Sequence, residues 1–341
     1  PAYPRCQAGG TMSRTDASSG PGPENREASA PPPPPAWRRR LGEALESDLA
    51  YAFFRSPVAV ISAVVVGLII LAAVFAPLIA PHDPFDPASL NLMDGFSQPM
   101  TPNEFTGNTY WLGTDDQGRD VFSAILYGSR ISLFVGFAAV LLSAAMGVGL
   151  GLFAGYRGGW LDAVIMRIAD VQLSFPSILI ALLIYGVARG FIPPTEREAA
   201  AVWVLILAIG LSEWVQYAGA VRGVVLVEKE KEYVQAARLI GVAPWRIMAT
   251  HILPNAFGPI LVIATIGLAL AIIAEATLSF LGVGVSPTQP SLGTLIRIGQ
   301  GFLFSGEWWI LLFPALTLLA LALAINLLGD WLRDAINPKL R

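Results

Sequence analysis

The sequence predicts an all-α integral membrane protein with six transmembrane helices. Of its 341 residues, 54% are hydrophobic and only 14% are charged, whereas soluble domains carry about 25% charged residues. The apolar residues form long runs, and the first, from Val58 to Ala80, contains no charged residue. As a helix, this run is long enough to cross the roughly 30 Å hydrocarbon core of a bilayer.

Six segments have this character, at about 57–80, 131–155, 161–188, 200–221, 256–282 and 307–332. The third carries Asp162, Arg167 and Asp170 near its start, so only its later part is lipid-like. Arg167 and Asp170 are three residues apart and could pair on one helix face. Pro176 is expected to kink this span, because proline removes a helical hydrogen bond.

The second segment contains a regular series of small residues. Gly147, Gly151 and Gly155 are each four residues apart, which predicts a smooth ridge for close contact with another helix. A loose dinucleotide-binding pattern overlaps this series, but no strand precedes it, so the ridge is the better interpretation.

The basic residues predict the orientation. With an inside N-terminus, the outer segments would hold only five of the 22 Lys and Arg, namely Arg119, Arg130, Arg189, Arg197 and Arg297. Positive residues favour the cytoplasmic side, so both termini are expected in the cytoplasm. The polar segment between the fourth and fifth spans then also faces the cytoplasm.

Three parts are expected along the chain. Residues 1–40 are rich in Pro, Ser, Gly and Ala and lack the apolar residues needed to fold, so a disordered proline-rich tail is predicted. Residues 41–130 comprise an N-terminal helix, the first span and a long outer loop. Residues 131–341 form a five-span core, interrupted by the polar loop 231–254. The first span exceeds a signal-peptide core and is expected to be an uncleaved anchor.

The polar loop, KEYVQAARLIGVAPWRIMATHILP, predicts a helix, a turn and a second short helix. Gly241 suits a helix C-terminus because it accepts positive φ. Pro244 suits the first turn of the second helix, and Pro254 marks the entry to the next span.

Apolar and small residues of the first loop helix are expected to share one stripe, which consists of Tyr233, Ala236, Ala237, Ile240 and Val242. Such a helix can sit in a groove on a soluble partner or lie on lipid headgroups. Spacing alone does not separate these alternatives.

The series Gln235-Ala236-Ala237, Gly241 and Leu253-Pro254 resembles the cytoplasmic coupling loop of ABC-importer permeases. Gln235 replaces the usual Glu of that family, and His251 stands where Ile is expected. The resemblance favours a docking helix and implies ATPase-coupling roles for Tyr233, Gln235, Ala236, Ala237, Gly241 and Pro244.

Three further regions narrow the resemblance to the C-type subunits of dipeptide and oligopeptide (sometimes nickel) permeases. They are Tyr110–Val121, Ser279–Gly284 and Asn326–Asp334, the last followed by Asn337-Pro338-Lys339. Together with the loop, the resemblance covers about residues 40–341. It implies the type I ABC-importer permease fold in a bacterial inner membrane.

The resemblance also implies the partners and the mechanism. We expect a non-identical B-type permease subunit, two cytoplasmic ATPases and a periplasmic or lipid-anchored binding protein that delivers peptides. The coupling helix would transmit the movement of the ATPases to the translocation pathway. ATP and Mg²⁺ would be bound by the ATPases and not by this chain.

The chain itself is not expected to be an enzyme. A Walker A loop needs Gly-Lys, and Lys229, Lys231 and Lys339 follow other residues. The one cysteine and two distant histidines give no metal site, and the outer-loop carboxylates lack calcium-loop spacing. A net charge of −3 gives no case for nucleic acid.

Two acidic residues are expected inside spans, Glu213 in the fourth and Glu275 in the fifth. Intramembrane carboxylates are costly and often functional. They could line a pathway or gate, or they could form inter-helix hydrogen bonds. In the rival hypothesis, a self-sufficient secondary transporter or channel would use both as ion or proton sites, and the polar loop would be a surface helix.

Overall fold

The structure is a computed structural model, which describes residues 48–84, 86, 90–285 and 290–336. The predicted disordered tail and the Asn337-Pro338-Lys339 motif lie outside the described residues. Within them the chain is helical, and β-structure is limited to two isolated bridges, Pro102 to Thr109 and Thr114 to Asp120. The α-helices are α2 (Asp48–Arg55), α3 (Pro57–Val74), α4 (Ala76–Ile79), α5 (Val121–Arg157), α6 (Gly159–Leu173), α7 (Ser177–Phe191), α8 (Arg197–Glu228), α9 (Glu232–Leu239), α10 (Pro244–Ile247), α11 (Leu253–Phe280), α12 (Leu292–Phe302) and α13 (Trp309–Ile336).

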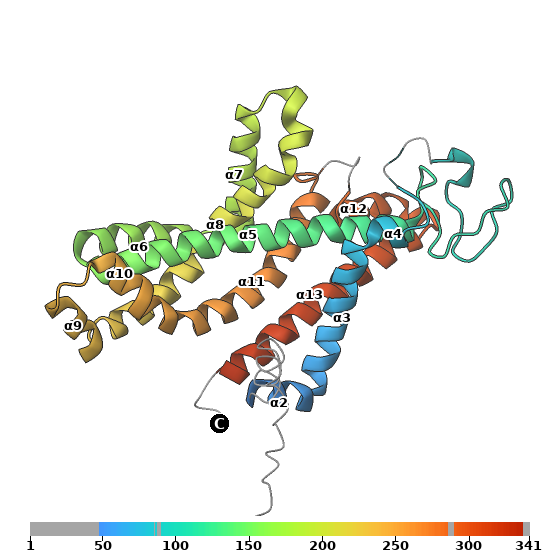
Figure 1. Ribbon diagram of the computed structural model, residues 1–341. Helices are drawn as coiled ribbons and strands as arrows, with labels where there is room; N and C mark the ends of the chain where they lie inside the picture. The colour runs from blue at the N-terminus through green and yellow to red at the C-terminus, as the bar shows by residue number, and fades with distance from the viewer. Residues whose placement is uncertain (1–47, 85, 87–89, 286–289, 337–341) are drawn as a thin grey trace, which may run out of the picture. The chain divides into compact units, whose positions relative to one another are not determined.

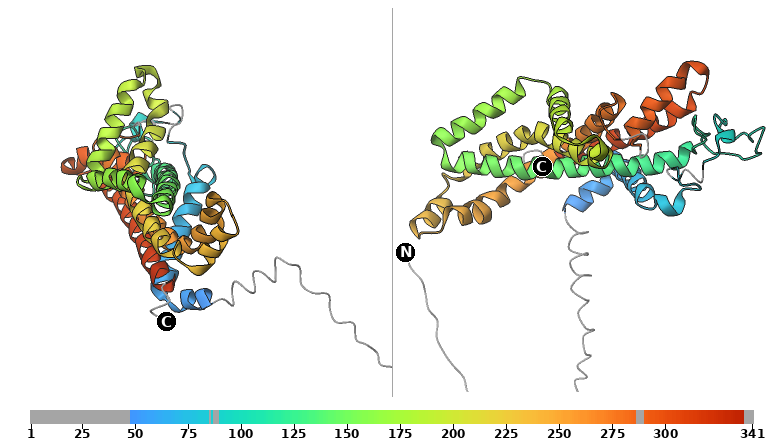
Figure 2. Two further views of the ribbon diagram at one scale, coloured as in Figure 1. Left: turned by 90° about the vertical axis from the view of Figure 1, so that its left-hand side faces the viewer. Right: turned by 90° about the horizontal axis from the view of Figure 1, so that it is seen from above.

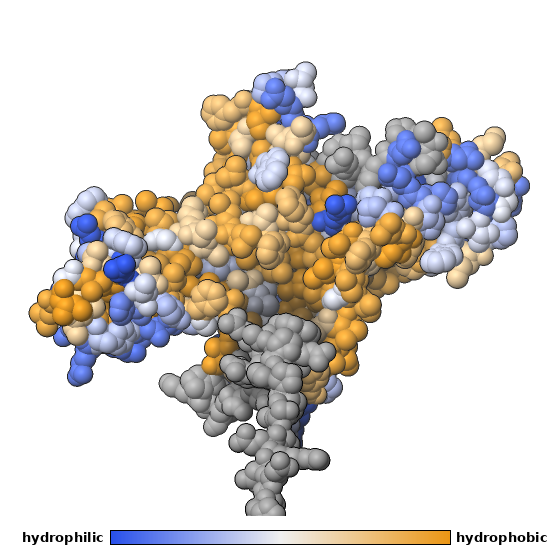
Figure 3. Space-filling model, viewed as in Figure 1, coloured by the Kyte–Doolittle hydropathy of each residue, from blue (hydrophilic) through white to orange (hydrophobic). Residues whose placement is uncertain are grey.

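Five of these helical segments are long and apolar enough to cross a membrane: α3, α5, α8, α13 and the continuous stretch Pro244–Phe280. A sixth crossing results if α6 and α7 together count as one span. The chain is therefore a multi-pass membrane protein, as its composition predicts. Figure 3 shows hydrophobic residues over the middle of the bundle and hydrophilic residues gathered towards both ends of α5.

The third span differs from the prediction of a single kinked helix. It consists of α6 and α7, which meet at an angle of 100°. Pro176 has no N–H to continue the helix and disfavours the helical conformation of Phe175 before it. The last amides of α6 instead bond within a turn, where Ser174 N–H donates to the Asp170 and Val171 carbonyls at 3.2 Å. The helix therefore ends at the proline and restarts in a new direction.

Helix α5 begins ten residues before the predicted span. The Asp120 carboxylate caps it by accepting the N–H groups of Phe122 and Ser123 at 3.3 and 3.0 Å, which satisfies amides that have no helical partner. The boundary expected at residue 130 therefore falls inside a helix. Arg119 pairs with Asp115 at 3.0 Å, so two of the outer-loop carboxylates have structural roles.

Helices α5 and α8 pack closely along their length, and the glycine ridge explains how. A Cβ on Gly151 would lie 2.5 Å from the Ala218 carbonyl oxygen, and one on Gly155 would lie 2.8 Å from the Val225 Cβ. Gly147 is equally close to the backbone of Trp214. The predicted ridge is confirmed, and it brings the two backbones together as small residues allow.

The two polar loops lie at opposite ends of α5. Figures 1 and 2 show the outer loop, drawn in teal, at the start of α5, and α9 and α10 near its end. The Lys229 ammonium, just before α9, donates to the Gly155 carbonyl at the last turn of α5 at 3.1 Å. The polar loop 231–254 and the long loop 81–120 are therefore separated by the apolar middle of the bundle.

Candidate functional site

The candidate site is the polar loop between α8 and α11, and its first helix ends as the sequence predicts. Gly241 has φ +81°, the left-handed conformation that glycine adopts without strain. The Val242 N–H donates to the Ala237 carbonyl at 3.0 Å, and the Gly241 N–H to the Arg238 carbonyl at 3.1 Å. This pair of bonds is a Schellman motif, which closes α9.

The second loop helix is continuous with the next span, contrary to the prediction of a separate short helix. Pro244 occupies the first turn of α10, as expected. The chain then passes through a π-helical turn, Met248–Ile252, directly into α11. Pro254 lies in the first turn of α11, where its missing N–H and its ring are accommodated by the wider turn. The second loop helix and the fifth span therefore form one continuous helical stretch, Pro244–Phe280.

A buried carboxylate ties the start of the loop to both flanking spans. Glu228, at the end of α8, is 6% exposed and accepts hydrogen bonds from Lys231 Nζ at 2.6 Å and from the Tyr233 hydroxyl. Asn255 of α11 donates to the same carboxylate at 3.3 Å and to the Tyr233 oxygen at 3.0 Å. The Tyr233 ring also stacks on His251, with centroids 6.3 Å apart. The hydrogen bond with Glu228 raises the pKa of Tyr233, so the phenol stays protonated.

The predicted apolar stripe of α9 is divided between two faces. Val234 and Ala237 are 0% and 5% exposed and pack inside the chain with residues of α8, α10 and α11. Ile240 is 80% exposed and points away from that core. Ala237, which the sequence analysis placed on the same stripe as Ala236, is therefore covered by the chain itself, because residues 234 and 237 share one face at helical spacing.

The exposed face of the polar loop begins with a polar and a small residue and continues with large apolar residues. Gln235 and Ala236 are exposed, and Gln235 Nε2 donates to the Glu230 carbonyl at 3.0 Å. Beyond them, Leu239, Ile240 and Trp245 are 87%, 80% and 66% exposed. We call these three residues the exposed tip. They lie on both sides of the Gly241 turn, and exposed apolar groups that project beyond a bundle are typical of contact surfaces.

The loop also contacts α5, the longest helix. The Arg238 guanidinium lies over the Tyr156 ring at 4.9 Å, a favourable cation–π arrangement. Lys229 holds the Gly155 carbonyl. The loop is thus fixed to the ends of α5, α8 and α11, three of the spans.

Next to the loop, α6 is held to α8 by an ion pair. Arg222 Nε and Nη2 donate to the two oxygens of Asp162 at 2.5 and 2.7 Å. Such a bidentate pair fixes orientation as well as distance. Arg167 and Asp170, which the sequence suggested could pair, form no ion pair among the described residues.

The two intramembrane carboxylates lie in different environments. Glu275 is fully buried, and its oxygens accept hydrogen bonds from the hydroxyls of Ser132 (2.6 Å) and Ser279 (2.7 Å). Ser132 Oγ also accepts the Leu292 N–H at 3.2 Å, so the group joins α5, α11 and α12. This enclosure favours the packing interpretation for Glu275 in this conformation. Glu213 on α8 is half-buried and accepts a hydrogen bond from Gln216 Nε2 at 3.0 Å, so it is the more exposed of the two carboxylates.

Sequence reasoning did not single out Glu228, Leu239 or Trp245. Glu228 carried a signal, since it ends an apolar helix three residues before Lys231, a spacing that favours ion pairs. Leu239 and Trp245 carried none, because the exposure of an apolar residue depends on which face the rest of the chain covers.

The comparisons with known proteins cover both the loop and the first span. Residues 147–341 match the family model of the binding-protein-dependent transport system inner membrane component. Residues 47–99 match the N-terminal transmembrane domain of oligopeptide transport permease C. The first match contains the whole candidate site.

Curated relatives align over most of their own length. The dipeptide transport system permease protein DppC of Haemophilus influenzae is 38% identical over 83% of this chain and 91% of its own. The oligopeptide transport system permease protein OppC of Bacillus subtilis is 37% identical over 87% of this chain and 90% of its own. The glutathione transport system permease protein GsiD of Pectobacterium atrosepticum is 36% identical, over 85% and 89% respectively.

Proposed function

The chain belongs to the family of binding-protein-dependent transport system inner membrane components, among the dipeptide and oligopeptide permease C subunits, and from this premise we propose that it imports di- and oligopeptides as one permease subunit of an ATP-driven transporter. It has the type I ABC permease fold of that family. The relatives' names support peptides as the cargo. Members of the family are permease subunits and not themselves enzymes, and hydrolysis is assigned to separate ATPases that bind ATP and Mg²⁺.

The observation that carries the proposal is the exposed tip on a loop fixed to three spans. Leu239 and Ile240 leave almost all of their surface uncovered, and an apolar helix end of this kind can fill a groove on a soluble partner. The Schellman turn at Gly241 keeps the tip in one conformation. Docking on an ATPase thereby buries the tip without reorganising the loop.

Transmission follows from how the loop is anchored. When ATP closes the ATPase dimer, the docked α9 moves with it. The Glu228 hydrogen bonds pass that movement to α8 and α11, and the Lys229 and Arg238 contacts pass it to α5. Because these contacts are short and packed, the spans move as rigid bodies, and the pathway alternates between inward and outward openings.

The remaining subunits follow from the same premise. A B-type permease would form the other half of the pathway, a second ATPase would dock on it, and a periplasmic or lipid-anchored binding protein would deliver the cargo. Of the two carboxylates, Glu213, which is half-buried, would line the pathway. The bacterial inner membrane is the location that this premise implies, and the surplus of basic residues on one side supports an orientation with both termini in the cytoplasm.

Co-purification tests the docking surface directly. Ile240→Glu places a charge at an 80% exposed position, so the fold should be retained. We expect recovery of the ATPase to fall by about tenfold or more, as for the loss of a central contact residue. The matched control is Phe304→Glu, at a position 99% exposed in the turn after α12, which should leave recovery unchanged. Equal recovery with both variants would contradict the proposal.

Reconstituted uptake separates the remaining alternatives. A secondary transporter or channel predicts ATP-independent uptake by the lone chain, whereas the proposal requires the ATPases and the binding protein. Labelled dipeptide, longer peptide and nickel chelate, offered to the same complex, distinguish the cargo classes.

A further inference from the structure

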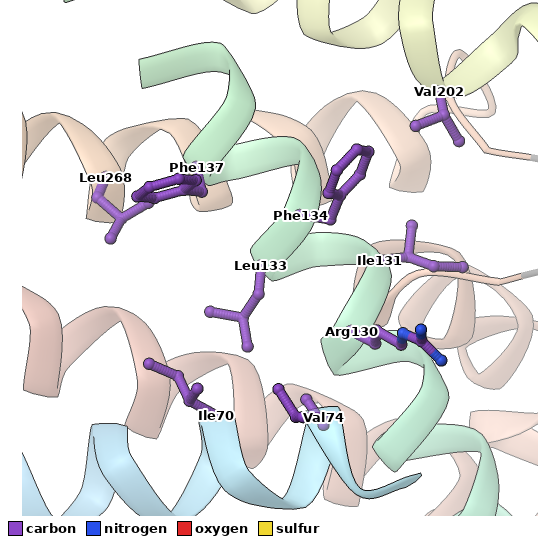
Figure 4. Close-up of a pocket in the computed structure, with 10 residues that line it drawn as sticks. Ile70, Val74, Arg130, Ile131, Leu133, Phe134, Phe137, Val202 and Leu268 are labelled. Carbon is purple, nitrogen blue, oxygen red and sulfur yellow. The ribbon is translucent and has the colours of Figure 1, made fainter. Parts of the chain in front are cut away.

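A cavity of about 580 Å³ lies between α3 and α5 and is lined almost entirely by apolar side chains. Figure 4 shows Leu133 pointing from α5 towards Ile70 and Val74 of α3, while Phe137 lies beside Leu268 of α11. Its size lies within the range of ligand-binding pockets, about 300–1,000 Å³. The cavity is open at the surface of the bundle, since Phe134 and Phe137 are 50% and 58% exposed.

A single charged side chain, Arg130, lies at one end of this apolar cavity. Arg130 shares its wall and is exposed. Among the described residues, none accepts a hydrogen bond from its guanidinium or forms an ion pair with it. Figure 4 shows Arg130 at one end of the row of α5 side chains and Phe137 at the other. The cavity is therefore polar at one end and apolar along the rest.

We expect the cavity's polar end at the edge of the bilayer. Arg130 immediately precedes the second apolar segment of the sequence, at about 131–155, and Ile131, Leu133, Phe134 and Phe137 of that segment line the cavity. A segment of this length crosses the hydrocarbon core, so Arg130 is expected at the level of the lipid phosphates and the apolar part of the cavity in the hydrocarbon region. With an inside N-terminus, as proposed above, this is the outer leaflet.

We propose that this cavity binds a phospholipid, with its phosphate on Arg130 and one acyl chain along Leu133 and Phe137 towards Leu268. An acyl chain already in the membrane gains nothing from the hydrophobic effect by entering the cavity. Specific binding therefore depends on charge-assisted hydrogen bonds between guanidinium and phosphate, which can be bidentate, and on close packing of the chain. Arg130 supplies the first and the cavity the second.

The other candidate occupant of the cavity is a helix of the partner permease, and the two occupants differ in how they would satisfy Arg130. Such a helix would bury the apolar wall but would need its own carboxylate to satisfy Arg130, and it would be retained or lost with the partner subunit. A lipid brings the phosphate at the required level of the membrane and binds independently of transport. The inference thus survives even if the proposed cargo is wrong.

Native mass spectrometry of the detergent-purified complex, with whichever subunits remain bound, tests the inference. The probes are dioleoyl phosphatidylglycerol and the phosphate-free dioleoylglycerol. Arg130→Gln should weaken binding of the phospholipid by about tenfold, the loss of one charge-assisted interaction, and leave the weak binding of dioleoylglycerol unchanged. Leu133→Trp fills the cavity and should weaken binding of both probes. Arg189→Gln, which removes an arginine that does not line this cavity, should change neither.

Two results would overturn the inference. One is equal retention of the phospholipid by the native protein, Arg130→Gln and Leu133→Trp. The other is loss of a co-purifying permease subunit from the Arg130 and Leu133 variants with lipid counts unchanged, which would assign the cavity to a subunit interface.

Discussion

At the scale of single residues, the site depends on conformations and contacts that only a few side chains can make. Gly241 adopts φ +81° with open space around it, so its requirement is conformational and not steric. Glu228 satisfies three donors from two segments. Asp94 plays a comparable part in the outer loop, where it is 1% exposed. These polar groups each hold a loop at one end of the bundle.

Gly241→Ala tests the conformational requirement. An L-residue at this φ costs about 1–2 kcal/mol, which should fray the end of α9 and displace the exposed tip. ATPase co-purification should decrease several-fold while membrane insertion and yield are unchanged. Gly223→Ala, at an open helical position of α8, is the control and should have no such effect. Undiminished ATPase co-purification with Gly241→Ala would show that the turn geometry is not needed.

The ionised carboxylate of Asp94 should make the stability of the outer loop depend on pH. Burial raises its pKa, but hydrogen bonds from Thr106, Asn108 and Tyr110 outweigh burial and hold the pKa below the ordinary value. A depressed pKa means that its stabilisation is present above the ordinary carboxyl value of about 4 and is lost as pH falls through the lower folded value.

Hydrogen exchange of residues 91–120, corrected for intrinsic rates, should show loss of protection in acid. Asp94→Asn should show reduced protection at neutral pH and little further change in acid. Burial of Tyr110, together with its hydrogen bond to Asp94, raises the pKa of the Tyr110 phenol to about 12. The phenol therefore stays protonated between acid and neutral pH. Protection that is independent of pH in the native protein would contradict the role of Asp94.

At the scale of elements, the contact between α5 and α8 depends on small residues on one face of α5. Gly151 cannot carry a Cβ without meeting the Ala218 backbone, whereas Gly149, two positions away, has nothing within 4 Å. The two glycines thus give a matched pair on one helix. The break between α6 and α7 at Pro176 and the continuous α10–α11 helix, whose π-helical turn accommodates Pro254, are the other features at this scale.

Gly151→Ala should lower thermal stability, because overpacking a tight contact costs about 1–3 kcal/mol. Gly149→Ala should leave stability unchanged or raise it slightly, since alanine favours the helix by up to about 1 kcal/mol over glycine. The melting temperatures of the two detergent-solubilised variants provide the measurement. A smaller loss for Gly151 than for Gly149 would contradict the ridge packing.

At the scale of the whole molecule, the described helices connect two polar ends through an apolar middle. The loop with the exposed tip lies at the end of α5, and the outer loop lies at the start of α5. Trp309 Nε1 of α13 holds the outer loop by donating a hydrogen bond to the Thr114 carbonyl at 3.1 Å. A pull on the tip therefore reaches α5, whose first turn is capped by Asp120 of the outer loop. This connection gives the coupling proposal a physical path.

Glu228→Ala should uncouple that path without removing the docking surface. The ATPase should still co-purify, because the exposed tip is unchanged. Uptake per ATP hydrolysed should fall by about tenfold, since three donors lose a buried acceptor and the loop loosens. Glu230→Gln, at an exposed position two residues away, serves as the control. Full uptake in Glu228→Ala would show that movement travels by another route.

The sequence by itself determined the membrane class, the approximate spans, the glycine ridge and the closing role of Gly241. These follow from local properties: apolar run length, four-residue spacing and the φ preference of glycine. Its motifs also led to the permease family, which the comparisons confirm.

Only the tertiary structure decided which face of α9 is free, because that depends on residues of α8, α10 and α11 that are distant in sequence and cover Val234 and Ala237. For the same reason, sequence could not show that Glu275 is enclosed by serines of two helices while Glu213 is not. It also could not distinguish a kink from the 100° break at Pro176, since a proline ends a helix or bends it according to whether surrounding contacts hold the two halves in line.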